Sequence, residues 1–259
     1  MSARRARKPP VLMIHGAFCG PWAMEGFAEV FREAGYTVHV PALRFHEMRP
    51  APSALATTSL ADYAADLEEE IAALAAPPIL VGHSMGGLLA QMLAARTKIA
   101  ALVLLAPSAP WGVSPASLSE IAAASALLLR PVFWTQLLKP DRHIALSQSL
   151  GGLPPESREA VFARLGPESG RAMLEIMHWG LDMTRASAVE TGAVTCPLLL
   201  LAGAEDKVNA PGTVARIAAR YGQHATLETL PGMGHWLIGE PGWEKLAARA
   251  IAWLDDLKP

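Results

Sequence analysis

Short apolar runs alternate with amphipathic stretches over most of this 259-residue chain. The runs are rich in Val, Ile and Leu, which is typical of strands buried on both faces of a parallel sheet. The stretches between them repeat apolar residues at helical spacing. This alternation predicts an α/β fold, with a mostly parallel sheet of about six strands and helices on both faces. The expected strands are residues 11–14, 36–40, 79–81, 100–106, 198–203 and 227–230.

The alternation stops between Pro107 and Gly192. The pattern there is helical but irregular, and prolines interrupt it repeatedly. An insertion after the fourth expected strand would lie above the carboxyl edge of the sheet, so we expect a helical cap. The expected division is a core of residues 1–107 and 193–259 and a cap of residues 108–192. The chain length fits one α/β domain with such an insertion.

A glycine-rich turn directly follows the apolar run at residues 79–81. Its sequence, GHSMG, places Ser84 between Gly82 and Gly86, and a helix-forming segment comes next. A strand, a sharp turn and a helix in this order are typical of a nucleophile elbow, which lifts a serine hydroxyl clear of the sheet. Glycines fit because a Cβ at either place would meet the neighbouring chain. We therefore expect Ser84 to be a catalytic nucleophile.

A serine nucleophile needs a base, and the base needs an acid that orients it. In a fold with a nucleophile elbow these residues follow in the order serine, acid, histidine. Asp206 comes just after the expected strand at residues 198–203, and His235 follows the strand at 227–230. Glu205 competes with Asp206 as the acid. All the reactive side chains then share the carboxyl edge of the sheet, where parallel α/β folds place their sites.

An oxyanion hole requires backbone N–H donors beside the nucleophile. In this fold one donor is the residue after the serine, which is Met85 here, and the other comes from a loop after an earlier strand. The loop after residues 11–14 begins His15-Gly16-Ala17. We therefore assign the amides of Ala17 and Met85 to the oxyanion hole.

The turn at Ser84, the later acid and histidine, and the early His-Gly-Ala loop together resemble the serine esterases of the α/β-hydrolase superfamily, over essentially the whole chain. The loop begins only a few residues in, which is similar to compact members such as plant methylesterases, hydroxynitrile lyases and bacterial esterases. The family pattern Gly-x-x-Asp-x-Val matches Gly203, Asp206 and Val208. The resemblance therefore favours Asp206 over Glu205 as the acid.

Two positions depart from the hydroxynitrile lyases. Those enzymes carry a threonine after the loop histidine and a lysine after the catalytic histidine, where this chain has Gly16 and Trp236. Because the charge of that lysine stabilises departing cyanide, we do not expect lyase activity.

The expected reaction is hydrolysis of a small-molecule carboxylic ester through an acyl-enzyme. The same constellation also allows C–C bond hydrolysis, amide hydrolysis, a cofactor-free peroxidase reaction, or a receptor that binds a ligand without turnover. Large apolar residues of the loops and the cap are candidates for substrate contact. The expected contacts are Phe18, Trp111, Phe133, Trp134 and Trp236.

Composition narrows the partners and the setting. A net charge of −2 argues against nucleic acid as a partner. Arg4, Arg5, Arg7 and Lys8 form a basic cluster, but no apolar segment separates them from the first strand, so we expect no signal peptide and a cytoplasmic protein. Prolines and glycines break the uncharged residues 71–95, so no membrane span is expected. We expect no metal and no cofactor, since neither metal-ligand spacing nor a nucleotide motif occurs. The oligomeric state is left open.

Overall fold

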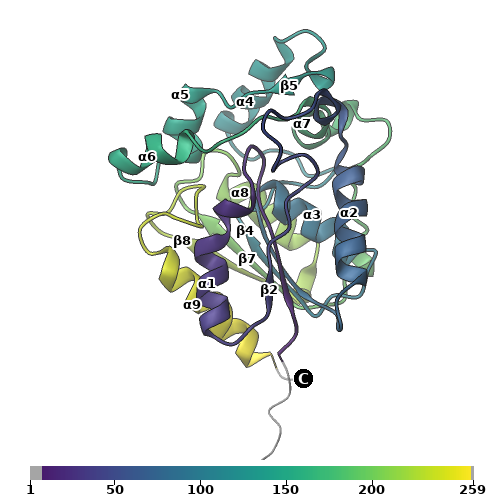
Figure 1. The fold of residues 1–259 in the computed structure, drawn as a ribbon, viewed down its shortest axis with the longest axis vertical. Helices are drawn as coiled ribbons and strands as arrows, with labels where there is room; N and C mark the ends of the chain where they lie inside the picture. Colours follow the sequence, from purple (N-terminus) through teal and green to yellow (C-terminus); the bar gives the residue numbers. More distant parts are fainter. Residues whose placement is uncertain (1–7, 258–259) are drawn as a thin grey trace, which may run out of the picture.

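The computed structural model describes residues 8–257. A six-stranded sheet forms its centre, in the order β2-β1-β3-β4-β7-β8, and every neighbouring pair runs parallel. Its strands are β1 Val11–Ile14, β2 Val38–His39, β3 Ile79–His83, β4 Ala101–Leu105, β7 Leu198–Gly203 and β8 Ala225–Leu230. This sheet confirms the expected α/β fold (Figure 1).

Helices cover both faces of the sheet (Figure 1). One face packs against α2 Leu60–Ala72, α3 Met85–Ala94 and α8 Pro211–Ala219, and the other against α1 Glu25–Glu33 and α9 Trp243–Asp256. Along β1, side chains alternate between the two layers: Leu12 and Ile14 join the first, and Val11 and Met13 the second. Because both faces are buried, every position needs an apolar residue, and the strand reads as a continuous apolar run.

Local sequence determines where two of the helices end or begin. After α1, Gly35 adopts φ +85°, and its N–H donates to the carbonyl of Arg32 at 2.8 Å. This is the C-terminal cap that glycine favours. At the start of α2, the Asp62 carboxylate accepts the N–H of Ser59 at 2.8 Å, and the Ser59 hydroxyl accepts an amide in return. This reciprocal capping box begins the helix where the sequence predicts it.

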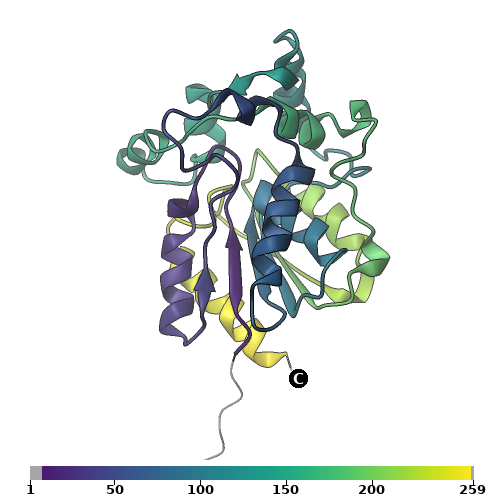
Figure 2. The same ribbon diagram turned by 45° about the vertical axis from the view of Figure 1, so that its right-hand side comes forward.

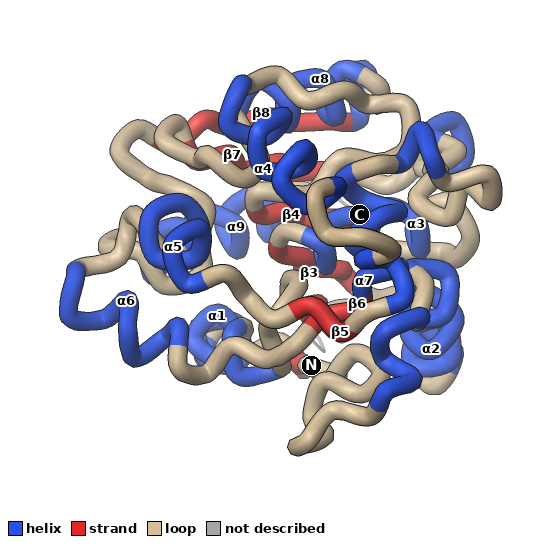
Figure 3. The backbone as a smooth tube through the Cα atoms, turned by 90° about the horizontal axis from the view of Figure 1, so that it is seen from above, coloured by secondary structure: helices blue, strands red, loops and turns tan. Residues whose placement is uncertain are grey.

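Residues 108–192 lie over the carboxyl ends of the strands, above the layers of core helices (Figures 1 and 2). The helices of this segment are α4 Leu118–Leu128, α5 Arg142–Ile144, α6 Pro155–Phe162 and α7 Gly170–Met177, with a π-helical turn at Ala145–Ser149. Two very short strands, β5 Leu137–Leu138 and β6 Glu168–Ser169, pair antiparallel. Seen from above, this β5–β6 ribbon lies across the end of the central sheet (Figure 3). The sequence pattern predicts only helices here, because two-residue strands leave no periodic signal.

Three further details differ from the sequence-based expectation. The strand expected at 36–40 shrinks to β2, an edge strand that pairs only with β1. The helix from Ser59, expected to reach Ala76, ends at Ala72, with Ala73 as its C-terminal cap. The expected loop at 42–58 contains a short 3₁₀ turn. The 3₁₀ turns are Pro21–Ala23, Ser53–Thr57, Phe133–Thr135, Trp179–Leu181, Thr191–Ala193 and Gly222–His224.

The basic N-terminal cluster falls mostly outside the described residues, because Arg4, Arg5 and Arg7 lie there. Its last member, Lys8, forms an ion pair with Asp255 of α9 at 2.9 Å. Within residues 8–257, no helix combines the length and the apolar character needed to cross a bilayer.

Candidate active site

Ser84 occupies the sharp turn between β3 and α3. Its backbone has φ +53°, a left-handed conformation that costs of order 1–3 kcal/mol for a residue with a side chain. A Cβ at Gly82 would lie 2.3 Å from the carbonyl oxygen of Gly86, and a Cβ at Gly86 would lie 2.2 Å from that of Ile14. Both positions therefore exclude any side chain, which is the physical basis of the G-x-S-x-G pattern.

A chain of hydrogen bonds joins Ser84, His235 and Asp206. Nε2 of His235 lies 3.1 Å from Oγ of Ser84, and its Nδ1 lies 2.9 Å from Oδ2 of Asp206. Because Nδ1 faces a carboxylate, it carries a proton, which leaves Nε2 as an acceptor for the serine proton. His235 is 4% exposed and Asp206 is 5% exposed, so little water competes for these bonds.

Asp206, and not Glu205, faces the histidine. Its second oxygen accepts the N–H groups of Val208 at 2.7 Å and Asn209 at 2.9 Å. The side-chain Nδ2 of Asn209 in turn donates to the carbonyl of Ala106, just beyond β4, at 2.8 Å. Both carboxylate oxygens are thus engaged, which holds Asp206 in one orientation. Glu205 is exposed.

Two buried histidines beside Ser84 are neutral. Burial lowers the pKa of His15 and of His83 to about 3. Nε2 of His83 donates to the carbonyl of His235 at 2.9 Å, which supports the loop that carries that residue. His15 donates from Nδ1 to the carbonyl of Gly16 at 2.9 Å, and its Nε2 accepts the N–H of Leu43 at 3.1 Å. Both histidines therefore act as uncharged supports of the surrounding loops.

Ala17 and Met85 line a small cavity at Ser84. Met85 is the first residue of α3, where an amide has no acceptor within the helix and the helix dipole is positive. Ala17 belongs to the loop after β1. This loop approaches Ser84 closely, since a Cβ at Gly16 would lie 3.1 Å from the Cβ of Ser84. The two expected oxyanion donors thus line the same cavity as Ser84.

Two adjoining cavities lie between the sheet and residues 108–192. The inner cavity, of about 170 Å³, is lined by Ser84 and His235. The outer cavity, of about 330 Å³, extends beneath α4. Met173, Ile176 and Met177 of α7 line both cavities, so one helix face extends from the outer cavity to the inner cavity at Ser84.

Two of the five apolar residues expected at the substrate line these cavities. Phe18 lines both of them, and Trp236 lines the inner one. Phe133 does not, because it is fully buried and packs against Leu138 and Leu174 as the centre of a small cluster within residues 108–192.

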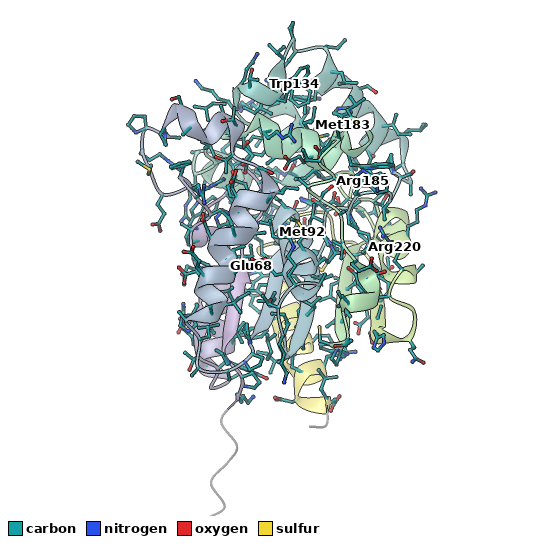
Figure 4. The ribbon with its side chains drawn as sticks, turned by 90° about the vertical axis from the view of Figure 1, so that its right-hand side faces the viewer. Glu68, Met92, Trp134, Met183, Arg185 and Arg220 are labelled. Carbon is teal, nitrogen blue, oxygen red and sulfur yellow. The ribbon has the colours of Figure 1, made fainter. Side chains whose placement is uncertain are left out.

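Trp111 and Trp134 are also absent from the lining of both cavities. Trp111 packs edge-on against Trp179 with 5.2 Å between ring centroids, and the guanidinium of Arg185 lies over its ring. Trp134 is 38% exposed and lies at the end of the molecule farthest from the central sheet (Figure 4). The expectation for Phe133, Trp111 and Trp134 rested on residue type, which does not distinguish a packing aromatic from a lining one.

Sequence reasoning missed Ile144 and Ile176 among the lining residues. A signal was present, because Met173, Ile176 and Met177 have the i, i+3, i+4 spacing of one helix face. It could not show that this face points at Ser84. In the described part of the chain, no group of three or more His, Cys, Asp or Glu side chains is placed to bind a metal ion.

Comparisons with known proteins agree with this architecture. A family model described as the alpha/beta hydrolase family matches residues 11–249. A pimeloyl-[acyl-carrier protein] methyl ester esterase from Chromobacterium violaceum is 30% identical over 241 residues, covering 88% of this chain and 87% of that protein.

Solved structures show the same fold. A methylesterase from Arabidopsis superposes with a TM-score of 0.72 at 17% identity, covering 96% of this chain and 100% of that one. A pyrethroid hydrolase from Sphingobium faniae superposes with a TM-score of 0.73 at 20% identity, covering 96% and 98%. The resemblance noted from the sequence is confirmed, and the chain belongs to the alpha/beta hydrolase family.

Proposed function

We propose that this carboxylic ester hydrolase acts as a serine esterase through an acyl-enzyme intermediate. Oγ of Ser84 attacks the ester carbonyl while Nε2 of His235 accepts its proton, and Asp206 stabilises the imidazolium that forms. The amides of Ala17 and Met85 donate to the oxyanion of the tetrahedral intermediate. His235 then protonates the leaving alcohol and activates the water that releases the acid.

One observation carries this proposal: the continuous hydrogen-bonded path from Ser84 through His235 to Asp206, with contacts of 3.1 and 2.9 Å. Its strength comes from the geometry and not from the residue types alone. Ser84 has a strained backbone in the turn, and His235 presents an acceptor nitrogen to its hydroxyl. Two backbone amides fix the carboxylate of Asp206. These are the mutual contacts that activate a serine hydroxyl.

The inner cavity supports hydrolysis over cyanohydrin cleavage. Among the described residues that line it, none is lysine or arginine. Trp236, which stands directly after His235, lines the cavity and is 6% exposed. Departing cyanide would therefore find no cation beside the base.

We propose a neutral ester with a small or medium apolar acyl group as the substrate class. The inner cavity is lined by apolar side chains such as Ile144, Leu150 and Met173, which come from the proposed cap of residues 108–192 over a core of residues 1–107 and 193–259. Each methylene buried there contributes about 0.8 kcal/mol, whereas an unpaired carboxylate is costly to bury.

A fluorophosphonate probe and a panel of esters test the proposal. Purified protein should be labelled at Ser84 and should turn over simple esters many times. The panel varies the acyl and alcohol parts separately. It includes methyl esters, because the Chromobacterium violaceum relative is named for one. Three further measurements test the alternative reactions. A matched amide tests amide hydrolysis, a vinylogous diketone tests C–C bond hydrolysis, and a peracid assay tests the peroxidase reaction. Labelling without turnover, followed by retention of the ligand, would instead identify a receptor.

A further inference from the structure

A fully buried carboxylate, Glu168, reaches from β6 to the loop that carries the proposed oxyanion donor Ala17. We call residues 15–19 the oxyanion loop. We propose that Glu168 is a positioning residue, which fixes the oxyanion loop through the backbone of Phe18. The geometry of the oxyanion hole then depends on how residues 108–192 pack on the core. This inference rests on the proposed function.

Glu168 accepts four hydrogen bonds, two on each oxygen. Oε2 accepts the N–H of Phe18 at 3.2 Å and lies 3.0 Å from Nε2 of His46. Oε1 accepts the hydroxyl of Tyr63 at 2.8 Å and the N–H of Ser169 at 2.7 Å. The side chain is 0% exposed. Every bond therefore forms without competition from water, and removing the acceptor leaves its donors unpaired.

His46 supplies the charge that balances this carboxylate. Its Nδ1 lies 3.0 Å from the carbonyl of Arg44, and its Nε2 faces Glu168, so both ring nitrogens face acceptors and both carry protons. Burial alone lowers the pKa of His46, but the charge and the hydrogen bond of Glu168 outweigh it and raise that pKa. Because His46 is cationic and Glu168 is anionic, this buried pair carries no net charge. The pair therefore does not repel negative charge at the nearby oxyanion hole.

Phe18 is held from both ends of its backbone. Its N–H donates to Glu168, and its carbonyl accepts the N–H of Gly166 at 2.8 Å. Phe18 has φ +63°, an uncommon conformation for a residue with a side chain, which persists only where its surroundings enforce it. On the N-terminal side of Ala17, Nδ1 of His15 donates to the carbonyl of Gly16 at 2.9 Å, which restrains that part of the backbone as well.

The amide N–H of Ala17 therefore belongs to the first of two consecutive restrained peptide groups, Gly16–Ala17 and Ala17–Phe18. One is held by a core histidine, and the other is held by the segment 166–168. An oxyanion donor must point at the position of the developing charge, so a shift in its direction weakens the transition state more than it weakens substrate binding. Loss of Glu168 should thus lower kcat and leave KM nearly unchanged.

Glu175 offers a matched control. It also belongs to residues 108–192, its side chain is also 0% exposed, and it also joins that segment to the core. It accepts the N–H of Leu60 at 2.7 Å and the hydroxyl of Ser59 at 2.8 Å, and it pairs with Arg171. None of these partners belongs to the oxyanion loop. A purely structural role for buried carboxylates predicts equal effects at both positions.

The experiment compares Glu168→Gln with Glu175→Gln in the full chain. For each variant we would measure Tm, kcat and KM on a neutral butyrate ester, and Kd for an alkylboronic acid. The boronic acid adds to the serine hydroxyl and places an oxygen in the oxyanion hole. We expect both variants to lose Tm. Only Glu168→Gln should lose kcat and boronic-acid affinity, by about tenfold to a hundredfold, with KM nearly unchanged.

Equal kcat and Kd in the two variants, or a loss at Glu168 that appears only in KM, would overturn the inference. If Glu168→Gln does not fold, His46→Gln replaces it, because it removes the partner of the same carboxylate oxygen and should lower kcat in the same way. Fluorophosphonate labelling of wild type separates this result from a failure of the proposed function. An unlabelled, inactive wild type refutes both, whereas an active wild type with an unaffected Glu168 variant refutes the inference alone.

Discussion

The sheet and the segment above it are stabilised by different physical means. In β4 of the sheet, Leu102 and Val103 are fully buried between two layers of helices. In α4 of the segment 108–192, no residue is buried, and Leu118 is 84% exposed. That segment meets the core through apolar residues such as Leu150 and Ala172, and also through the buried carboxylates Glu168 and Glu175, which each accept hydrogen bonds from core residues.

The difference matters because apolar burial has no direction, whereas a hydrogen bond to a buried carboxylate does. The core gains stability from the sum of many contacts, and loops at its edge carry the proposed chemistry. Within the upper segment, α4 contributes little to that sum, and directional bonds from Glu168 and Glu175 help to determine where the segment lies on the core. Mutations in the two regions should therefore fail in different ways.

The largest effect is expected at Ser84, the proposed nucleophile. Ser84→Ala should lower kcat by about 10⁴-fold or more, because no other group supplies the attacking oxygen, while Tm stays near that of wild type. Steady-state kinetics and fluorophosphonate labelling measure this. Ser125→Ala, a serine of α4 whose hydroxyl donates to the carbonyl of Ile121, serves as the control and should keep full activity. Near-wild-type turnover by Ser84→Ala would move the chemistry away from the elbow.

The orienting acid should follow closely. Asp206→Asn should lower kcat by about 10³- to 10⁴-fold, since an amide cannot stabilise the His235 imidazolium or keep its tautomer. Glu205→Gln, the exposed neighbour, is the matched control and should change kcat little. Comparing kcat for the two variants on one ester decides between them. The reverse ranking would transfer the role to Glu205.

Stability should separate the two regions most clearly. Leu102→Ala in β4 should lower the free energy of unfolding by about 2–5 kcal/mol, because it leaves a cavity between closely packed layers. Leu118→Ala in α4 should change it by less than about 0.5 kcal/mol, since that side chain is already exposed. Urea denaturation of both variants provides the measurement. A large loss at Leu118 would mean that a partner or a second copy covers α4.

Substrate charge should give the smallest effect. A neutral butyrate ester should exceed the hemisuccinate of the same alcohol in kcat/KM by about tenfold, which corresponds to about 1.4 kcal/mol. The reason is the lack of lysine and arginine among the described residues lining the inner cavity. A preference for the hemisuccinate would contradict the proposed apolar site. It would point to Arg130 and Lys139, the cationic residues that line the outer cavity. Arg130→Ala and Lys139→Ala would then show which cation binds the acid.

The sequence could predict the central sheet and the place of the proposed catalytic residues because both depend on local constraints. Ser84 needs glycines on either side, and each strand needs an unbroken apolar run. The order of serine, acid and histidine then follows from the way a parallel sheet brings its carboxyl ends together. The same constraint brings Asp206 and His235 to the edge where Ser84 lies.

The remainder depends on contacts between distant parts of the chain. Nothing near Phe133 distinguishes it from Phe18, yet one packs in the upper segment and the other lines both cavities. The role of Glu168 could not be predicted from the sequence either, because its partners Phe18 and Tyr63 lie 150 and 105 residues away along the chain. A buried carboxylate in an irregular stretch looks like any solvated acid until its donors are known.

The two bonds from residues 166–168 to the backbone of Phe18 bear on how freely this enzyme can be recombined with its relatives. Segments inserted at the same edge of a sheet are natural units for exchange in chimeric enzymes. Here the graft boundary does not coincide with the functional boundary, since part of the proposed oxyanion hole is shaped from the inserted side. A chimera that replaces residues 108–192 therefore has to bring an acceptor for the Phe18 amide and a donor for its carbonyl, whatever new specificity it is meant to confer.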